Sequence, residues 1–327
     1  MAQQPGCVTV QLDWANAFNA VSRQAVIDAV ARRAPQLLPF VAWAYRQPSR
    51  LFVPGAPPES APVMSQTGVR QGDPMGPLLF ALALQGPLQV IAAQHPDSRP
   101  IAYADDTSLQ GTPDQVVAAF RALTAEGAKI GLTARPDKCV AFSTDSAAAR
   151  AVAERLGIQH ASDGIVAVGT PIGTDPFVAE HAATKAASVL AALDELQQTP
   201  LSAQDKFIVL RASQQLRVAH LKRTCDWTCI LAAVEKVEDK VITNAWSIVG
   251  SANADLAQAL LPLSMGGLGI ELTEPIVARA ATISAAALAH AALQDGHAFY
   301  QPFEGPAGAS IKQAWRELHQ CWHKRNP

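Results

Sequence analysis

The stretch IAYADDTSLQG, residues 101–111, places two adjacent carboxylates between two short runs that are typical of β-strands. Aspartate is disfavoured inside strands and common in turns, so we expect Asp105 and Asp106 at the tip of a β-hairpin. Two neighbouring negative charges repel each other, which favours a bound cation beside them. The stretch therefore predicts a hairpin that carries part of a cation site. Taken alone, two adjacent aspartates in a turn are more typical of an exposed structural turn than of a cation site.

The remaining ligands are sought among acids at the ends of other strands. Asp13 ends the β-branched run CVTVQLD, residues 7–13, and could converge on the hairpin tip from a neighbouring strand. Three carboxylates on rigid β elements would suit two Mg²⁺ ions, which prefer hard oxygen ligands and clamp both oxygens of a phosphoryl transfer. Clustered acids without metal should repel, so at least one should have a raised pKa. The alternative is that Asp13 merely caps the next helix.

Composition bounds the function classes. The chain has 327 residues, of which 49% are hydrophobic and 17% charged, as expected for a soluble globular protein. The formal net charge of −2 excludes a global basic field, so any nucleic-acid surface must be local. The 5 scattered cysteines favour a reduced, intracellular chain, and Cys225 and Cys229 lack the second pair that a zinc site needs. The sequence does not distinguish nucleus from cytoplasm.

No secretory signal and no apolar run of about 18 residues is apparent, so we expect no membrane partner. The first part of the chain alternates strand and helix patterns, and from about residue 178 the pattern is helical only. The predicted fold class is therefore α+β followed by an all-α region, with the boundary near Gly173. Expected strands are 7–13, the 101–111 hairpin, 138–144 and 165–173; expected helices are 22–34, 37–45, 77–93, 113–129, 178–198, 202–223, 228–249 and 275–294, with a loop at 54–62.

At this point the sequence resembles the reverse transcriptases of non-LTR retrotransposons. YADD, residues 103–106, is similar to the family's Y-x-D-D box, and DWANAF, residues 13–18, resembles its earlier acidic motif. GVRQGDPMGPLLFALAL (68–84) resembles the third motif, and GAKIGLTARPDKCVAF (127–142) resembles the lysine-containing segment that follows. VAVGTPIG (166–173) is similar to the strand that grips the primer. The five motifs occur in the family's order, which makes the set highly specific.

The resemblance implies a polymerase palm over residues 1–173, with an antiparallel sheet backed by helices and a partial fingers insertion at 35–70. Residues 174–327 would form a helical thumb and C-terminal region. It also implies that Asp13, Asp105 and Asp106 bind two Mg²⁺ ions, or Mn²⁺ in their place, and are catalytic. Asp105 should be the stronger ligand of the adjacent pair, because successive strand residues point to opposite faces.

Further roles are implied around the incoming nucleotide. Phe18 would pack under the sugar and exclude a 2′-hydroxyl, which separates RNA from DNA building blocks. Gln71 would contact nucleotide and template, and Gly72 would permit close backbone approach. Lys138 would offset charge near the triphosphate and could protonate the leaving group. Arg70 would contact a phosphate or the template. The alternatives are a core aromatic for Phe18, a solvated lysine for Lys138 and a surface salt bridge for Arg70.

The implied partners are an RNA template, a DNA primer and deoxynucleoside triphosphates; the oligomeric state is unknown. The basic helix pattern DKFIVLRASQQLRVAHLKR (205–223) suits a thumb that contacts phosphates. The residues singled out there are Arg211, Arg217, Lys222 and Arg223. The alternative is an amphipathic core helix with a solvated face.

Departures from the family pattern define a second hypothesis. The fingers strands expected before the acidic motif are not seen, Gly76 stands where a small hydroxyl residue is usual, and Asn19 stands where Asp is common. No endonuclease or RNase H pattern is visible. The chain is therefore either an RNA-directed DNA polymerase fragment, whose primer extension by itself is expected to be very weak or absent, or an inactive remnant that keeps the palm fold and weak nucleic-acid binding. Whether Met1 is the true start is open. An unrelated two-metal phosphohydrolase is disfavoured because Gln71-Gly72 has no role in one.

Overall fold

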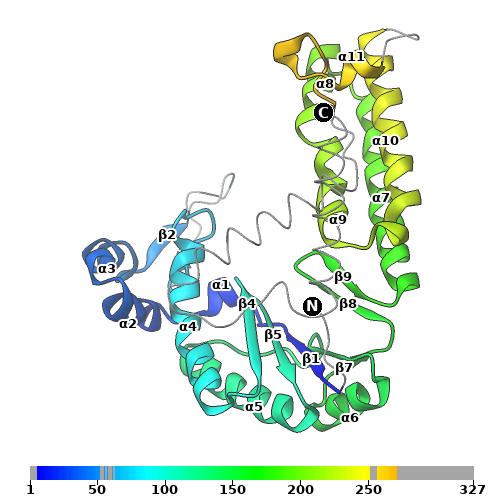
Figure 1. Ribbon diagram of the computed structural model, residues 1–327. Helices are drawn as coiled ribbons and strands as arrows, with labels where there is room; N and C mark the ends of the chain where they lie inside the picture. The colour runs from blue at the N-terminus through cyan, green and yellow to red at the C-terminus, as the bar shows by residue number, and fades with distance from the viewer. Residues whose placement is uncertain are drawn as a thin grey trace, which may run out of the picture. The chain divides into compact units, whose positions relative to one another are not determined.

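The computed structural model describes residues 6–51, 55, 57, 61, 63–250 and 256–270 (Figure 1). The chain divides into two compact units, residues 3–162 and residues 163–327 with 1–2, which we call the N-terminal and C-terminal units. The division falls between Ser162 and Asp163, earlier than the expected boundary near Gly173. The expected helix at 275–294 lies outside the described residues.

The N-terminal unit is built on a five-stranded sheet with the order β4-β5-β1-β6-β7. The strands are β1 Val8–Leu12, β4 Arg99–Tyr103, β5 Asp106–Gly111, β6 Val140–Phe142 and β7 Gln159–Ala161. Three pairs are antiparallel as expected, but β6 and β7 are parallel. The expectation of a wholly antiparallel sheet is wrong at this edge because helix α6, Ser146–Leu156, carries the chain back between β6 and β7.

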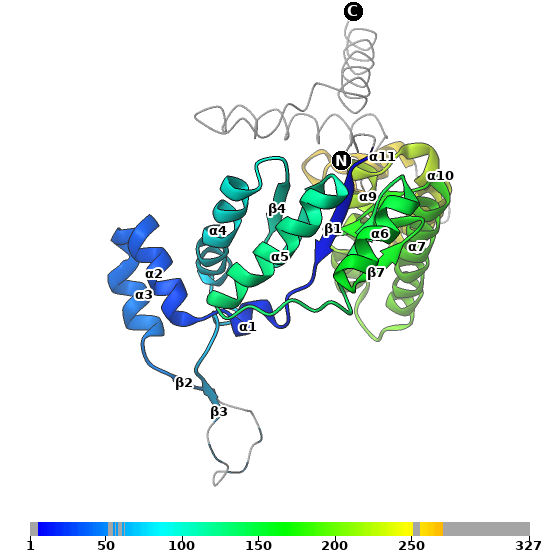
Figure 2. The same cartoon turned by 90° about the horizontal axis from the view of Figure 1, so that it is seen from below.

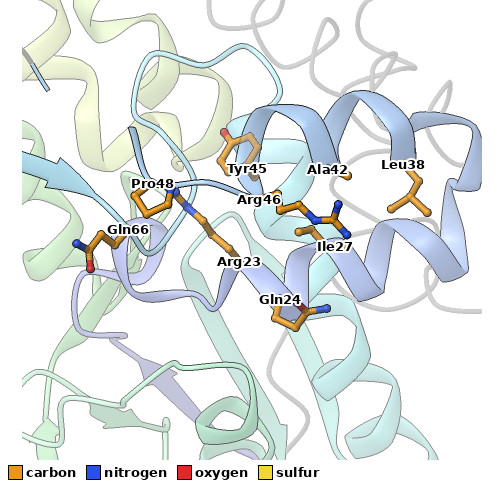
Figure 3. A pocket seen from close by; sticks show the side chains of 9 residues that line it. All are labelled: Arg23, Gln24, Ile27, Leu38, Ala42, Tyr45, Arg46, Pro48 and Gln66. Atoms are coloured by element: carbon orange, nitrogen blue, oxygen red, sulfur yellow. The ribbon is translucent and has the colours of Figure 1, made fainter. Parts of the chain in front are cut away.

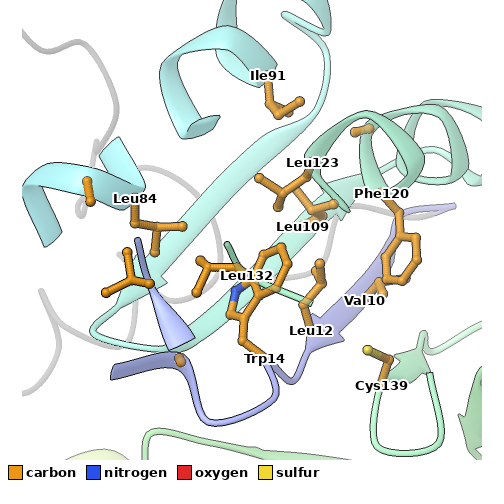
Figure 4. Close-up of a cluster of buried hydrophobic side chains, with 14 of the residues drawn as sticks. Val10, Leu12, Trp14, Leu84, Ile91, Leu109, Phe120, Leu123, Leu132 and Cys139 are labelled. Atoms are coloured by element: carbon orange, nitrogen blue, oxygen red, sulfur yellow. The ribbon is translucent and has the colours of Figure 1, made fainter. Parts of the chain in front are cut away.

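Alternation along the strands buries one face of this sheet under helices. Val10, Leu12 and Leu109 point to the buried face, where helices α4 (Gly76–Gln94) and α5 (Pro113–Lys129) pack together. Figure 2 shows α5 and α6 along this face, and Figure 4 shows the side chains that fill it. The other face carries partly exposed residues such as Gln11 and Ser108 toward its acidic end. The sheet therefore presents an open face that ends in carboxylates.

Helix α4 corrects the expectation about apolar runs. Its 19 residues make it long and apolar enough to cross a membrane by length and composition, although one such helix is weak evidence. Here α4 packs against α2 (Arg23–Arg33), α5 and β4, and its buried residues include Leu79, Phe80 and Leu84. These contacts are those of a core helix.

Short helices and a hairpin complete the N-terminal unit. Ser22 caps α2 by accepting a hydrogen bond from the Ala25 backbone, as the sequence predicts. The elements are α1 Ala17–Ala20, a 3₁₀ turn Pro35–Leu37, α3 Leu38–Tyr45, and the antiparallel strands β2 Ser49–Leu51 and β3 Val63–Ser65. The β2–β3 pairing was not expected from sequence.

The C-terminal unit is a hairpin followed by helices. The expected single strand 165–173 is instead β8 Gly164–Ala167 and β9 Thr170–Gly173, because Val168 and Gly169 adopt positive φ and turn the chain. The expected helix 202–223 is broken into α8 Ala203–Ala212, a 3₁₀ segment Gln214–Val218 and α9 Ala219–Thr224. The other helices are α7 Asp175–Gln198, α10 Trp227–Val249, α11 Leu256–Leu260 and a 3₁₀ turn Leu263–Met265. Helices α7 and α10 pack along their length around Val189, Leu193 and Val241.

Candidate active site

The strand register brings Asp13 and Asp106 together. Leu12, the last residue of β1, pairs with Thr107 of β5, so Asp13, which directly follows β1, lies across from Asp106, the first residue of β5. Directly opposed residues of an antiparallel pair point to the same face of a sheet. Leu12 and Thr107 are buried on the helix-covered face, so the two acids project to the open face. Asp105 lies in the two-residue turn, because Tyr103 pairs with Asp106 across it.

Two buried residues, Trp14 and Thr107, hold the turn that contains Asp105 through hydrogen bonds. Trp14, which follows Asp13, donates a hydrogen bond from its indole Nε1 to the Thr107 hydroxyl at 3.1 Å. That hydroxyl in turn donates to the Asp105 carbonyl at 3.3 Å. Trp14 and Thr107 are only 4% and 1% exposed, and Gly127 of α5 leaves the space that the indole ring fills. The buried neighbours of the acids thus fix the end of β1 against the hairpin turn.

A second segment holds the backbone of Asp13. Its N–H donates to the Cys139 Sγ at 3.5 Å, and its carbonyl accepts from the Arg135 N–H at 2.8 Å. Trp14 forms an isolated antiparallel bridge with Ala134. Asp13 is therefore fixed between β5 on one side and residues 133–139 on the other.

The acids influence one another electrostatically. Partial desolvation raises the pKa of Asp106 above its ordinary value, and the negative charges of Asp105 and Asp13 raise it further. The expectation that at least one of the three acids has a raised pKa is confirmed in direction. Among the residues that the structure describes, no three His, Cys, Asp or Glu side chains stand at the spacing of a preformed metal site. The acids are neighbours, and their roles as ligands remain a prediction.

Phe18 contacts the third motif, residues 68–84, through both its side chain and its backbone. Phe18 in α1 stacks on Phe80 of α4 with ring centroids 4.6 Å apart, and it is partly buried against the core. Its carbonyl accepts a hydrogen bond from the Val69 N–H at 2.7 Å. A Cβ on Gly68, whose φ is +69°, would lie 2.4 Å from the Asn19 Cα, so only glycine permits this approach. Asn19 is itself exposed.

Gln71 and Gly72 lie exposed in the turn before α4, with Gly72 at a φ of +83°. Lys138 is likewise exposed, at the start of the segment that leads into β6. Gly76 is buried, and a Cβ there would lie 3.0 Å from the Arg70 carbonyl. The departure from the usual hydroxyl residue therefore coincides with a tight approach between the turn and the helix.

Arg70 is placed differently from either expectation. Its guanidinium donates to the Ala44 carbonyl and the Ser49 hydroxyl, and it lies 5.0 Å from the ring centroid of Tyr45. Within the described part of the chain its buried Nε has no hydrogen-bond partner. Arg23 contacts the same ring from 5.4 Å. Arg70 therefore holds α3 to the third motif through its guanidinium, which leaves it a structural residue in place of the expected phosphate contact.

A pocket of about 360 Å³ opens beside this pair of arginines (Figure 3). It lies among α2, α3 and the residues next to β2 and β3, and none of the three acids lines it. Its lining comprises Arg23, Gln24, Ile27, Leu38, Ala42, Tyr45, Arg46, Pro48 and Gln66. Arg23 is 8% exposed, and its guanidinium donates to the Gly68 and Gln47 carbonyls and the Ser65 hydroxyl. The pocket is a feature of the packing around α3.

The basic residues of the C-terminal unit are not equivalent. Lys222 is 3% exposed and its ammonium is paired with Glu238 of α10, so the expectation that it contacts a phosphate is corrected. The expectation of one continuous helix over 202–223 does not reveal this, because the structure breaks the segment into α8, a 3₁₀ segment and α9, and Lys222 is buried in α9. Arg223 is exposed, whereas Arg211 and Arg217 are half-buried.

One residue beside the site was not singled out from sequence. Arg135 lies across from Asp13 on the side away from β5, and its side chain pairs with Asp137 at 2.7 Å. It lies in the segment that contains Lys138, so only its position in the fold distinguishes it from an ordinary surface residue.

Comparison with known proteins gives the following matches. The family model described as "Reverse transcriptase (RNA-dependent DNA polymerase)" matches residues 1–176. A relative, the "Retrotransposable element SLACS 132 kDa protein" of Trypanosoma brucei gambiense, is 25% identical over 280 residues, which are 79% of this chain and 22% of the relative. The chain thus spans about a fifth of that protein's length. A solved structure of telomerase from Candida albicans with a fragment of telomeric RNA matches with 10% identity and a TM-score of 0.33, over 91% of this chain and 50% of that one.

Proposed function

The chain belongs to the reverse transcriptase family, and from this membership we propose that it is the RNA-directed DNA polymerase domain of a retrotransposon-type element. The observation that supports the proposal most strongly is the strand register, in which Leu12 pairs with Thr107, so that Asp13 follows directly across from Asp106 and beside Asp105 in the turn. These are the acids of the two motifs through which the sequence resembles the family. Its substrates would be an RNA template, a DNA primer and deoxynucleoside triphosphates.

In this proposal the N-terminal unit is the polymerase palm. The helices and hairpin of residues 35–70 would be a partial fingers insertion, and the helical C-terminal unit would be the thumb. A palm needs an open sheet face with acids at one end, because the substrate phosphates must reach the metal ligands. The half-exposed face of β4, β5 and β1 offers that arrangement.

The chemistry of the donors fits two divalent cations. Asp13, Asp105 and Asp106 would hold them, because Mg²⁺ and Mn²⁺ take hard oxygen ligands and leave positions for substrate phosphates. Partial desolvation is the larger cause of the raised Asp106 pKa, and the repulsion from Asp105 and Asp13 that adds to it is the kind that a bound cation relieves. When bound, the ions would supply charge stabilisation at the attacking and leaving oxygens. The rigid anchoring through Trp14 and Thr107 would keep the acids at fixed positions for this purpose.

The chain's own residues would position the remaining groups. The 3′-hydroxyl of the primer attacks the α-phosphate, and pyrophosphate leaves. Phe18, fixed by stacking on Phe80, would hold the sugar and exclude a ribonucleotide. The exposed turn Gln71-Gly72 would contact the nucleotide and template, and exposed Lys138 would hold a proton and a positive charge near the leaving pyrophosphate. Positioning supplies much of the rate in phosphoryl transfer.

Arg211, Arg217 and Arg223 would contact the nucleic-acid backbone. Arg223 is exposed, and the side chain of Arg217 makes long contacts of 3.3 Å to Gln214 and 3.4 Å to Ser188. Such side chains can exchange these contacts for phosphate oxygens. They would add affinity without sequence preference.

Single-nucleotide incorporation tests the proposal. The full chain in excess over a DNA primer on an RNA template is given one complementary deoxynucleoside triphosphate with Mg²⁺ or Mn²⁺. Enzyme excess reveals even slow incorporation. Asp105→Asn and Asp106→Asn should abolish it. Asp114→Asn is the matched control, since Asp114 is an exposed acid of the same unit at the start of α5.

Incorporation that survives in both site variants would contradict the proposal. Tight primer–template binding with no incorporation by the unaltered chain would instead favour the inactive remnant.

A further inference from the structure

The backbone of Arg135 pairs with that of Asp13, one of the three acids of the proposed active site. Its N–H donates to the Asp13 carbonyl at 2.8 Å, and the Ala15 N–H donates to the Thr133 carbonyl at 2.8 Å. With the bridge between Trp14 and Ala134, these bonds form a short antiparallel ladder in which Arg135 is directly opposite Asp13.

The ladder also fixes the face to which Arg135 projects. Opposed residues share a face, and neighbouring residues along a strand alternate. Trp14 is buried in the core, so Asp13 and Arg135 project to the open face. Asp13 thus has Asp106 on one side and Arg135 on the other, in a row of acid, acid and guanidinium across the end of the sheet.

The present partner of Arg135 is easily exchanged. Its Nη2 lies 2.7 Å from the Asp137 carboxylate, two residues along the chain, and the side chains are 41% and 64% exposed. Ion pairs with this exposure contribute little to stability. The charge of Asp13 also acts on the guanidinium, although less than that of Asp137. The pair can therefore open at small cost if a stronger anion arrives.

Lys138 lies on the same turn. Its N–H donates to the Arg135 carbonyl at 2.9 Å, which brings the two basic residues within one tight turn. Both side chains have exposed portions, and the turn is attached directly to Asp13. A polyphosphate held at Asp13 would thus meet two cations from one segment.

We propose that Arg135 binds the polyphosphate of the incoming deoxynucleoside triphosphate, and that Asp137 holds its guanidinium in place until the nucleotide arrives. The inference rests on the proposed function, because it needs a nucleotide at Asp13, Asp105 and Asp106. The planar guanidinium suits two parallel hydrogen bonds to phosphate oxygens, which an ammonium cannot make. Asp137 would compete with the phosphates for the same donors.

Nucleotide binding without chemistry tests this. The full chain is bound to an RNA template and a DNA primer that ends without a 3′-hydroxyl, in Mg²⁺. The dissociation constants of the next complementary deoxynucleoside triphosphate and of its monophosphate are measured. The variants are Arg135→Gln, Arg135→Lys, Asp137→Asn and the Arg135→Gln/Asp137→Asn double variant. Arg155→Gln and Asp114→Asn are matched controls, because Arg155 and Asp114 form an exposed ion pair of the same length, 2.7 Å, between helices α6 and α5.

Arg135→Gln should weaken triphosphate binding about tenfold, the loss expected for charge-assisted hydrogen bonds, and should change monophosphate binding much less. Arg135→Lys should fall between. Asp137→Asn should tighten triphosphate binding, and this gain should vanish in the double variant. The control variants should bind like the unaltered chain.

Equal triphosphate affinity for the unaltered chain and Arg135→Gln would overturn the inference while leaving the proposed function intact. Equal weakening of mono- and triphosphate would also overturn it, since that would indicate an indirect effect through Asp13. No templated triphosphate binding by the unaltered chain would overturn both. Thermal melting of each variant separates these outcomes from misfolding, and Arg135→Lys retains the charge if Arg135→Gln does not fold.

Discussion

The hydrogen bond between Trp14 and Thr107 should couple the end of β1 energetically to the hairpin turn. Thr107 is 1% exposed, and Thr107→Val removes its hydroxyl and leaves the Trp14 indole N–H buried without its partner. An unsatisfied buried donor costs about 1–3 kcal/mol of the free energy of unfolding. Trp14→Phe loses the same bond, about 1 kcal/mol, and buries a smaller ring, which costs about 1 kcal/mol more.

The double variant lacks both partners, so no buried donor is left over. Its loss should therefore be smaller than the sum of the two single losses by about 1 kcal/mol or more. Urea denaturation of the full chain, with equal m-values required for each variant, measures these differences. Thr124→Val is the matched control, because the Thr124 hydroxyl donates to the Arg121 carbonyl at an exposed site of α5. It should change stability by less than about 0.5 kcal/mol.

Losses that add to within about 0.3 kcal/mol would refute the coupling. If the coupling is present, Thr107→Val should also slow nucleotide incorporation, because the Thr107 hydroxyl supports the carbonyl of Asp105.

Three further predictions concern single positions. The pKa of Asp106 is raised on folding, so its protonated form stabilises the fold; this contribution is present below the ordinary value of 3.8 and is lost as pH rises through the raised pKa. Asp106→Asn should therefore melt at a higher temperature than the unaltered chain at pH 7 without metal, by a margin that shrinks in acid, and an unchanged margin would be inconsistent with this. Gly68→Ala should lower the free energy of unfolding by about 3 kcal/mol or more because its Cβ would meet backbone, whereas Gly72→Ala, which meets nothing within 4 Å, should lose about 1–2 kcal/mol; similar losses would argue against the close approach at Gly68. Lys222→Met should lower the free energy of unfolding by about 3–5 kcal/mol without weakening duplex binding, because it breaks the buried pair with Glu238. Arg223→Gln should weaken duplex binding and leave the free energy of unfolding nearly unchanged. Thermal melting and duplex binding at several salt concentrations measure the two effects.

Local patterns predicted most of the N-terminal unit because local chemistry decides those elements. Ser22 caps α2, and Pro113 begins α5 behind a capping box at Thr112. The turn between Tyr103 and Asp106 follows from the poor strand propensity of aspartate.

The elements that sequence reasoning missed depend on distant residues. Strands β2 and β3 pair although a long connection separates them in sequence. Strand β7 pairs with β6 only because α6 connects the two strands in parallel, and the short sequence of β7 does not reveal this partner. The turn at Val168, a β-branched residue with a φ of +50°, goes against local preference, so 165–173 looked like one strand.

For the candidate site, too, the sequence predicted the local motifs but not the contacts between distant residues. The motif order located the acids, but the strand register was needed to show that Asp106 is the residue across from Asp13. The expectation that Asp105 is the stronger ligand therefore stays a prediction. The burial of Lys222 argues against a phosphate contact by that residue, and the backbone pairing with Asp13 identifies Arg135 as a neighbour of the site. Neither burial nor backbone pairing can be read from the order of residues in the sequence.

The central claim is that Asp13, Asp105 and Asp106 together bind divalent cations at one place. Mn²⁺ binding to the full chain, counted by electron paramagnetic resonance with primer–template and nucleotide present, tests it most directly. We expect two tightly bound ions in the unaltered chain and in Asp114→Asn, the two that such sites hold. Fewer should bind to Asp13→Asn, Asp105→Asn and Asp106→Asn. The same number of bound ions in all five proteins would contradict the account, because the cations would then be held elsewhere.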